Sequence, residues 1–110
     1  MFLRRAVVSA VGALSLLVAV PSSANSAIGT FEYQTGPYPG IPHLVADPDS
    51  GQCINLYGAT EEDPAYAPKN LTASTATVFL DFDCSGDTFY VMDPGKILGS
   101  RLKLRSVIFS

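Results

Sequence analysis

The sequence predicts an all-β fold in which two antiparallel sheets pack as a sandwich. Several short segments alternate apolar and polar residues with a period of two, which is the pattern of a strand with one buried face. Clusters of glycine and proline separate these segments at close spacing, and no segment after the first 27 residues repeats its apolar residues at helical spacing. Six or seven short strands joined by tight turns are typical of a sandwich.

The first 27 residues have the pattern of a secretory signal peptide. Two arginines precede an apolar run over residues 6–20, which ends at Pro21. The run is shorter than the roughly 20 residues that a membrane span needs, so we expect no span in the mature form. Small residues then predict cleavage after Ala24 or within the next three residues, up to Ala27. The exported protein is therefore expected to be one domain over residues 28–110.

The mature chain is acidic. Five lysines and arginines remain downstream of the leader against ten aspartates and glutamates, which gives a formal charge of −5. Proteins that bind nucleic acids present a basic face to the phosphates, so a nucleic-acid partner is not expected.

Three short strands are predicted in the first half of the domain. Residues 30–34 place Phe31 and Tyr33 on one face and polar side chains on the other. Strands over residues 43–46 and 52–57 follow after turns rich in glycine and proline.

The segment 58–70 is predicted to be a long exposed loop. It is acidic, and Pro64 and Pro68 exclude a helix of any length there.

The second half predicts three more strands. Residues 75–83 alternate most clearly, and residues 88–93 return after a turn. Over residues 102–109 the apolar alternation slips by one position around Arg105 and Ser106, which predicts a bulge or an inward-pointing serine.

Cys53 and Cys84 are the two cysteines of the chain. An exported protein enters an oxidising compartment, so we expect them to form a disulfide. Closing a loop of about 30 residues should stabilise so small a domain by roughly 3–4 kcal/mol. Two thiols and the distant His43 do not complete a zinc site without carboxylates.

The two halves share a repeat. Each has an aromatic residue, a second bulky residue five positions later, a glycine two positions beyond that, and a later serine: Tyr33, Tyr38, Gly40 and Ser74 in the first half, and Phe79, Cys84, Gly86 and Ser106 in the second. We expect the aromatic ring to pack over a hairpin and the glycine to adopt a positive φ at its fold. The serine hydroxyl is expected to hold the bent backbone by a hydrogen bond.

This repeat resembles the Greek key motif of the βγ-crystallin fold, Tyr/Phe-x4-Phe/Tyr/Trp-x-Gly followed by a serine. The resemblance covers the mature chain and implies an antiparallel Greek key β-sandwich with two motifs in one domain. The chain is similar to the small secreted crystallin-like proteins of actinobacteria, which include the Streptomyces metalloproteinase inhibitor family and killer-toxin-like proteins. Two departures from the pattern are Cys84 in place of an aromatic residue and a longer first motif.

Calcium is the ligand that the resemblance suggests, through the pattern Asn/Asp-Asn/Asp-x-x-Ser/Thr-Ser. Of the two corresponding stretches, residues 69–74 keep one of the two Asn/Asp donors, Asn70. Residues 101–106 have cations where the carboxylates would stand. The remaining calcium candidates are spaced like the opening of an EF-hand loop: Asp81, Asp83 and Asp87. That loop would have Met92 where a bidentate glutamate is required, so we expect no metal and no cofactor.

The sequence does not predict an enzyme. His43 is the single histidine, and no cysteine is expected to be free for nucleophilic catalysis. The carboxylate pair Asp47 and Asp49 lies in a proline- and glycine-containing stretch and is explained as part of a turn.

We therefore expect a monomeric, secreted binding module, stapled by a disulfide, that presents the loop over residues 58–70 to an extracellular protein. The resemblance implies a peptidase as that partner and the protein as its inhibitor. One alternative is a killer-toxin-like antimicrobial, although a charge of −5 does not favour contact with anionic envelopes. Another is a structural, envelope-associated protein without a ligand.

Overall fold

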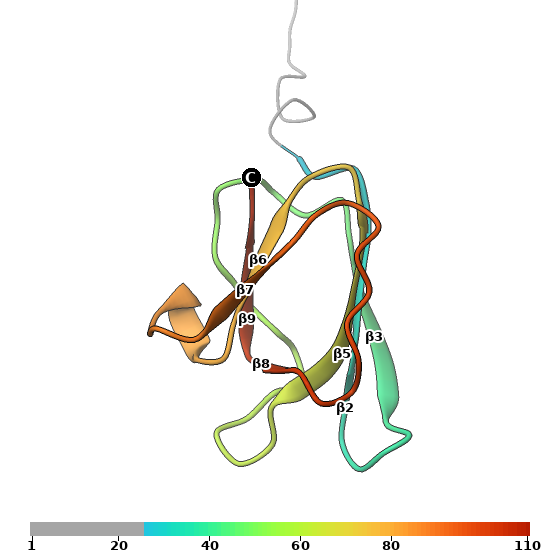
Figure 1. Cartoon of the computed structure of the whole chain (residues 1–110), viewed down its shortest axis with the longest axis vertical. Coiled ribbons are helices and arrows are strands. Elements are labelled where there is room, and N and C mark those ends of the chain that lie inside the picture. Colours follow the sequence, from blue (N-terminus) through green and yellow to red (C-terminus); the bar gives the residue numbers. More distant parts are fainter. Residues whose placement is uncertain (1–25) are drawn as a thin grey trace, which may run out of the picture.

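The computed structural model describes residues 26–110, which form two four-stranded sheets with antiparallel pairing throughout (Figure 1). The first sheet has the strand order β3-β2-β5-β8 and consists of β2 (Gly29–Thr35), β3 (Ile41–Ala46), β5 (Ala65–Thr72) and β8 (Lys103–Leu104). The second has the order β4-β9-β6-β7 and consists of β4 (Ile54–Asn55), β6 (Ala76–Phe79), β7 (Phe89–Met92) and β9 (Ser106–Phe109). The prediction of an all-β protein with two antiparallel sheets is confirmed.

Both sheets contribute their inward side chains to one core. Phe31 of β2 and Phe109 of β9 meet edge to face across the sheets, with ring centroids 5.5 Å apart and planes at 82°. Val78 and Val107, from β6 and β9, are fully buried beside them. Burying a side chain of this size stabilises the fold by roughly 1.5–3 kcal/mol, so these contacts hold the sheets face to face.

Each half of the chain adds one strand to the sheet of the other half. Strand β4, from the first half, pairs with β9 in the second sheet. Strand β8, from the second half, pairs with β5 in the first sheet. Neither sheet can therefore be completed by one half of the chain alone.

The predicted signal peptide lies outside the described residues except at its last two positions. Ala27 is fully buried, and its N–H donates to the carbonyl of Pro48 at 2.7 Å. Ala27 thus belongs to the folded domain, which begins before the predicted boundary at residue 28. Cleavage after Ala24 would leave this contact intact.

No helix within residues 26–110 is both long enough and apolar enough to cross a membrane.

The predicted exposed loop over residues 58–70 is wrong in its second half, because residues 65–72 form the strand β5 between β2 and β8. Pro68 lacks an N–H, but the strand tolerates it at an irregularity, where the register with β2 shifts between Glu32 and Gln34. Ala67 adopts a φ of 56° at this point. The carbonyl of Pro68 still accepts a hydrogen bond from the N–H of Leu98 at 3.0 Å.

The strand predicted over residues 75–83 is shorter in the structure. Strand β6 ends at Phe79, and a 3-10 turn, η2 (Phe82–Cys84), follows. Asp83 and Cys84 adopt positive φ angles of 64° and 51°, which are incompatible with an extended strand. The strand predicted over residues 52–57 is likewise reduced to two paired residues, Ile54 and Asn55.

The slip in alternation near the end of the chain marks a change of sheet. Leu104 is the last residue of β8 in the first sheet, and Ser106 is the first residue of β9 in the second. Ser106 is 0% exposed, so the predicted inward-pointing serine is confirmed.

Asn70 of β5 is a buried polar residue that ties three segments together. Its Nδ2 donates to the carbonyls of Ser74 and Met92, both at 2.8 Å. Its Oδ1 accepts from the hydroxyl of Thr72 at 2.7 Å and from the N–H of the same residue at 3.2 Å. Each of these groups would lose a hydrogen bond if the amide were removed, although the Thr72 hydroxyl would still donate to the Ser74 carbonyl at 3.1 Å.

We therefore predict that Asn70→Asp lowers the free energy of unfolding by about 2–4 kcal/mol, because a carboxylate cannot donate to two buried carbonyls. Gln52→Glu makes the same chemical change at an exposed position and should cost less than about 0.5 kcal/mol. Urea unfolding at pH 7 measures both values. Equal losses in the two variants would contradict a structural role for the Asn70 amide.

Candidate functional site

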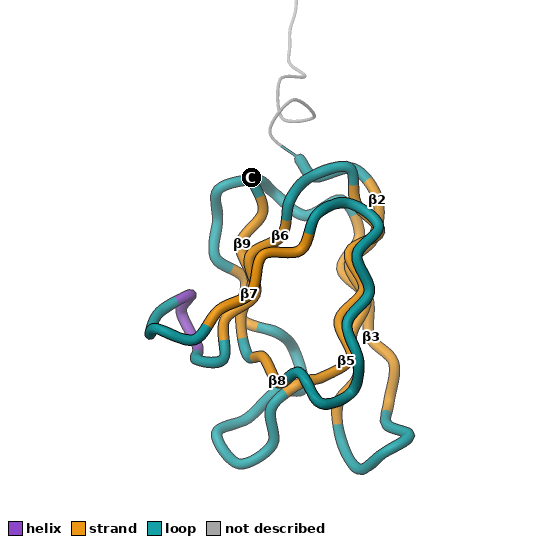
Figure 2. Tube along the Cα trace, viewed as in Figure 1, coloured by secondary structure: helices purple, strands orange, loops and turns teal. Residues whose placement is uncertain are grey.

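The connection from β4 to β5 forms an exposed loop at the end of the molecule opposite the C-terminus (Figures 1 and 2). Residues 58–64, here called the acidic loop, contain three consecutive exposed acidic residues: Glu61, Glu62 and Asp63. No ion pair of these three carboxylates is present among residues 26–110. The loop therefore presents uncompensated negative charge to solvent.

Arg105 holds the backbone of this loop from the inside. Its Nε donates to the carbonyl of Thr60 at 2.8 Å and its Nη2 to the carbonyl of Glu61 at 2.7 Å. Its Nη1 donates to the carbonyl of Leu80 at 3.0 Å. The planar guanidinium fork thus joins the acidic loop to the chain that leaves β6, and it leaves the acidic side chains unpaired.

The loop also has a turn of its own. The N–H of Thr60 donates to the carbonyl of Asp63, and the N–H of Asp63 donates to the Thr60 hydroxyl, both at 2.9 Å. Such paired bonds close the tip of the loop and restrict its backbone.

The start of the connection is fixed by an aromatic cluster. The hydroxyl of Tyr33 donates to the carbonyl of Tyr57 at 2.9 Å, and the Tyr33 ring stacks on His43 with centroids 5.1 Å apart. Burial raises the pKa of the Tyr33 hydroxyl, which keeps it protonated as a donor. The side chain of Tyr57 itself is 83% exposed beside the acidic loop.

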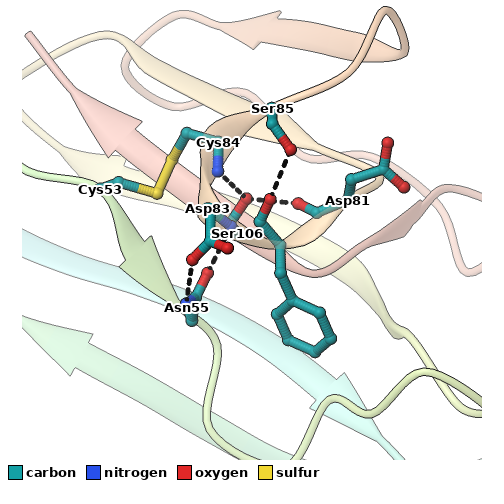
Figure 3. Close-up of a disulfide and its surroundings, with 8 residues drawn as sticks. Cys53, Asn55, Asp81, Asp83, Cys84, Ser85 and Ser106 are labelled. Carbon is teal, nitrogen blue, oxygen red and sulfur yellow. Dashed lines mark hydrogen bonds between the residues drawn. A yellow bond between two sulfur atoms is a disulfide. The ribbon is translucent and has the colours of Figure 1, made fainter.

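The predicted disulfide between Cys53 and Cys84 is confirmed (Figure 3). Cys53 precedes the acidic loop by five positions in the sequence. The disulfide links the residue before β4 to the hairpin after β6. Asn55 reinforces the link, because its Oδ1 accepts from the N–H of Asp83 at 2.8 Å and its Nδ2 donates to the Asp83 carboxylate at 3.0 Å. Strand β4 is thereby fastened to the second hairpin by a covalent bond and two hydrogen bonds.

In the second half, the repeat residues form the predicted contacts. The hydroxyl of Ser106 accepts from the N–H of Cys84 at 2.9 Å and donates to the carbonyl of Asp81 (Figure 3). Gly86 has a φ of 86°, and a Cβ there would collide with the Asp81 carboxylate. Phe79 packs against Phe89 of the next strand, with ring centroids 5.8 Å apart.

The first half is built differently. Gly40 has the expected positive φ, 84°, but Tyr38 is 78% exposed and does not pack over the hairpin. Ser74 cannot hold that hairpin, because β5 runs antiparallel to β2 and its end pairs with Gly29, at the far end of β2. The expectation for Ser74 is therefore wrong.

Tyr66 performs the task that was expected of Ser74. Its hydroxyl donates to the carbonyl of Gly36 at 2.7 Å, so it ties the first hairpin as Ser106 ties the second. Sequence reasoning missed Tyr66 because it placed the residue in a loop. The structure shows a period-two series of buried residues along β5, which are Tyr66, Pro68, Asn70 and Thr72. The sequence signal for this series is weak, because Asn70 and Thr72 are polar.

The calcium candidates Asp81, Asp83 and Asp87 do not assemble into a site. Within residues 26–110 no group of three or more His, Cys, Asp or Glu residues could hold a metal ion. The carboxylate of Asp83 accepts a hydrogen bond from Asn55, and the carboxylate of Asp81 lies at Gly86.

Comparison of the chain with models of protein families gave no match, and searches of curated proteins and of solved structures found no significant similarity.

The contacts of Ser106 generate a stability prediction. Ser106→Ala should lower the free energy of unfolding by about 1–3 kcal/mol, because it leaves the Cys84 N–H and the Asp81 carbonyl without a partner. Ser85→Ala removes a hydroxyl from an exposed hydrogen bond to the Phe82 carbonyl in the same hairpin and should cost about 0.5 kcal/mol or less. Urea denaturation with the disulfide intact measures both variants. If Ser106→Ala lowered the free energy of unfolding no more than Ser85→Ala, the Ser106 hydroxyl would not hold the hairpin.

Proposed function

We propose that the protein is a secreted binding module that uses the acidic loop to dock on an extracellular protein, and that this partner is a peptidase that it inhibits. The observation that carries the proposal is the clamp of Arg105 on the carbonyls of Thr60 and Glu61, because it fixes an exposed loop while leaving its side chains free. The pattern of a signal peptide and the disulfide between Cys53 and Cys84 support export.

A loop that is already ordered binds more tightly than a mobile one of the same sequence. Ordering an interface side chain costs roughly 0.5–1.5 kcal/mol on association, and a prefixed backbone avoids further cost of this kind. Complexes of peptidases with their inhibitors are pre-organised in this sense. The acidic loop meets the requirement because Arg105 holds the carbonyls of Thr60 and Glu61, and Tyr33 holds the carbonyl of Tyr57 just before the loop.

The strand order supports the resemblance to βγ-crystallins. In each half the fourth strand lies beside the first, and the second strand lies on the other side of the first: β5 and β3 flank β2, and β9 and β7 flank β6. A Greek key has this order for its first, second and fourth strands. We propose that the fold is a double Greek key in which the third strands, β4 and β8, are exchanged between the sheets.

The charge of the loop indicates what kind of peptidase surface it would contact. Glu61, Glu62 and Asp63 carry three unpaired negative charges on adjacent residues. Electrostatic complementarity raises association rates, so the partner should present a basic surface around its cleft and the interaction should weaken with salt.

The direct test is a titration of the purified mature protein against a panel of secreted metallo- and serine peptidases at low and at physiological ionic strength. Inhibition at or below micromolar concentration, weaker at the higher ionic strength, is the expected result. The absence of inhibition across the panel at micromolar protein would remove the proposal.

Substitution of Arg105 tests whether inhibition depends on the order of the acidic loop as well as on its charge. Arg105→Gln should raise the inhibition constant about tenfold or more, because it removes hydrogen bonds to two loop carbonyls. Hydrogen exchange at the amides of residues 60–63 should become faster in the same variant. Lys96→Gln removes the same charge at an exposed position away from the loop and should change neither measurement.

The double variant Glu61→Gln, Glu62→Gln should leave exchange at residues 60–63 unchanged and reduce the association rate and its salt dependence. If it instead inhibited as well as the parent protein at both ionic strengths, the acidic side chains would not contribute to docking.

A further inference from the structure

A hollow opens beside the acidic loop, between the β2–β3 hairpin and the turn before β8. It has a volume of about 420 Å³ and is lined by Gly36, Tyr38, Tyr66, Ser100, Arg101 and Lys103. A second hollow of about 330 Å³ shares Gly36, Tyr66 and Lys103 with the first and continues to Asp63 and Pro64. The first lies at the small end of the range for small-molecule sites, roughly 300–1,000 Å³.

The charge of this hollow is opposite to that of the protein. Five basic and ten acidic residues lie within residues 26–110, yet two of the five, Arg101 and Lys103, line the first hollow and no carboxylate does. Such a concentration of positive charge in a concave site attracts anions.

Arg101 is the free cation of the two. In the described part of the chain, its guanidinium has no hydrogen-bond or ion-pair partner. Lys103 is held in place, because its Nζ donates to the carbonyl of Ser100 at 3.1 Å and lies 5.0 Å from the centroid of the Tyr66 ring. An ammonium has three donors, so Lys103 keeps hydrogens for a ligand, but Arg101 alone offers an unused planar fork.

Two tyrosines line the hollow, and one of them, Tyr66, is fixed in place. Tyr66 is buried, and its hydroxyl bonds to the carbonyl of Gly36 across the hairpin. A Cβ at Gly40 would collide with that hydroxyl, so the hairpin lies directly against the ring. Tyr38, on the same hairpin, leaves most of its ring exposed at the mouth of the hollow.

We propose that this hollow binds a small monocarboxylate with an apolar body. The carboxylate pairs bidentately with the Arg101 fork, which matches its geometry. The apolar body packs against the exposed ring of Tyr38. Asp63 lies in the adjoining hollow and directs the carboxylate toward Arg101 by repulsion.

A monoanion fits better than a phosphate. The mature protein carries a charge of −5, which repels a doubly charged phosphate more strongly than a carboxylate with a single charge. An apolar body also gives the ligand a contact with the Tyr38 ring that inorganic anions lack.

Two sources share this chemistry, a free organic acid and the C-terminus of a peptide. The test is isothermal titration and amide chemical-shift mapping with 3-phenylpropanoate, with its neutral amide, and with a pentapeptide that ends in phenylalanine as the free acid or as the amide. We expect at least one of the two free acids to bind and to change the amide chemical shifts of residues 100–103. The corresponding amide should bind at least tenfold more weakly. Tighter binding of the pentapeptide acid assigns the site to a chain end, and tighter binding of 3-phenylpropanoate assigns it to a free acid.

Arg101→Gln should weaken binding of the carboxylate about tenfold or more, whereas Lys96→Gln, with the same loss of charge outside the hollow, should not. Several results would overturn the proposal: no binding, equal binding of acids and amides, an unchanged affinity in Arg101→Gln, or displacement of 3-phenylpropanoate by inorganic phosphate at equal concentration. Arg101 forms no hydrogen bond or ion pair with the acidic loop, so Arg101→Gln should leave peptidase inhibition unchanged. Failure of one proposal can therefore be told apart from failure of the other.

Discussion

The arrangement of the end of the molecule that carries the acidic loop depends on Arg105. Arg105 is the single residue between β8 in the first sheet and β9 in the second. Its N–H donates to the carbonyl of Phe79, and its carbonyl accepts from the N–H of Leu56, so its backbone joins the ends of β6 and β4. Its side chain then holds the acidic loop. The same residue therefore lies where the chain passes from one sheet to the other and fixes the position of the acidic loop.

Buried polar side chains fix the arrangement of the turns around the small core. Asn70 and Ser106 are fully buried and bond to backbone groups of neighbouring turns. A single hydrogen bond contributes only about 0.5–1.5 kcal/mol net, but leaving its buried partners unpaired costs more. These residues therefore fix which turns lie together, while the disulfide and the apolar core provide most of the stability of the folded state.

The sequence predicted the features that depend on local pattern and missed those that depend on distant partners. The all-β class, the disulfide and the inward Ser106 followed from period-two alternation, cysteine count and the slip near Arg105. Strand β5 was missed because Pro68 and the acidic residues before it outweigh its alternation, and its proline is tolerated only at an irregularity opposite β2. The hollow around Arg101 could not be predicted, since it is assembled from three segments that meet only after folding.

The exchange of β4 and β8 between the sheets also constrains how the chain folds. Strand β9 pairs with both β4 and β6, so the second sheet lacks its central strand until residues 106–109 have been made. Contacts of such large separation in sequence must close before either half is stable, which is the signature of high contact order and slow folding. The two halves cannot mature one after the other as the ribosome releases them. Slow folding suits the export that we propose, because a chain has to be unfolded to pass through an export channel and the disulfide can form on the oxidising side.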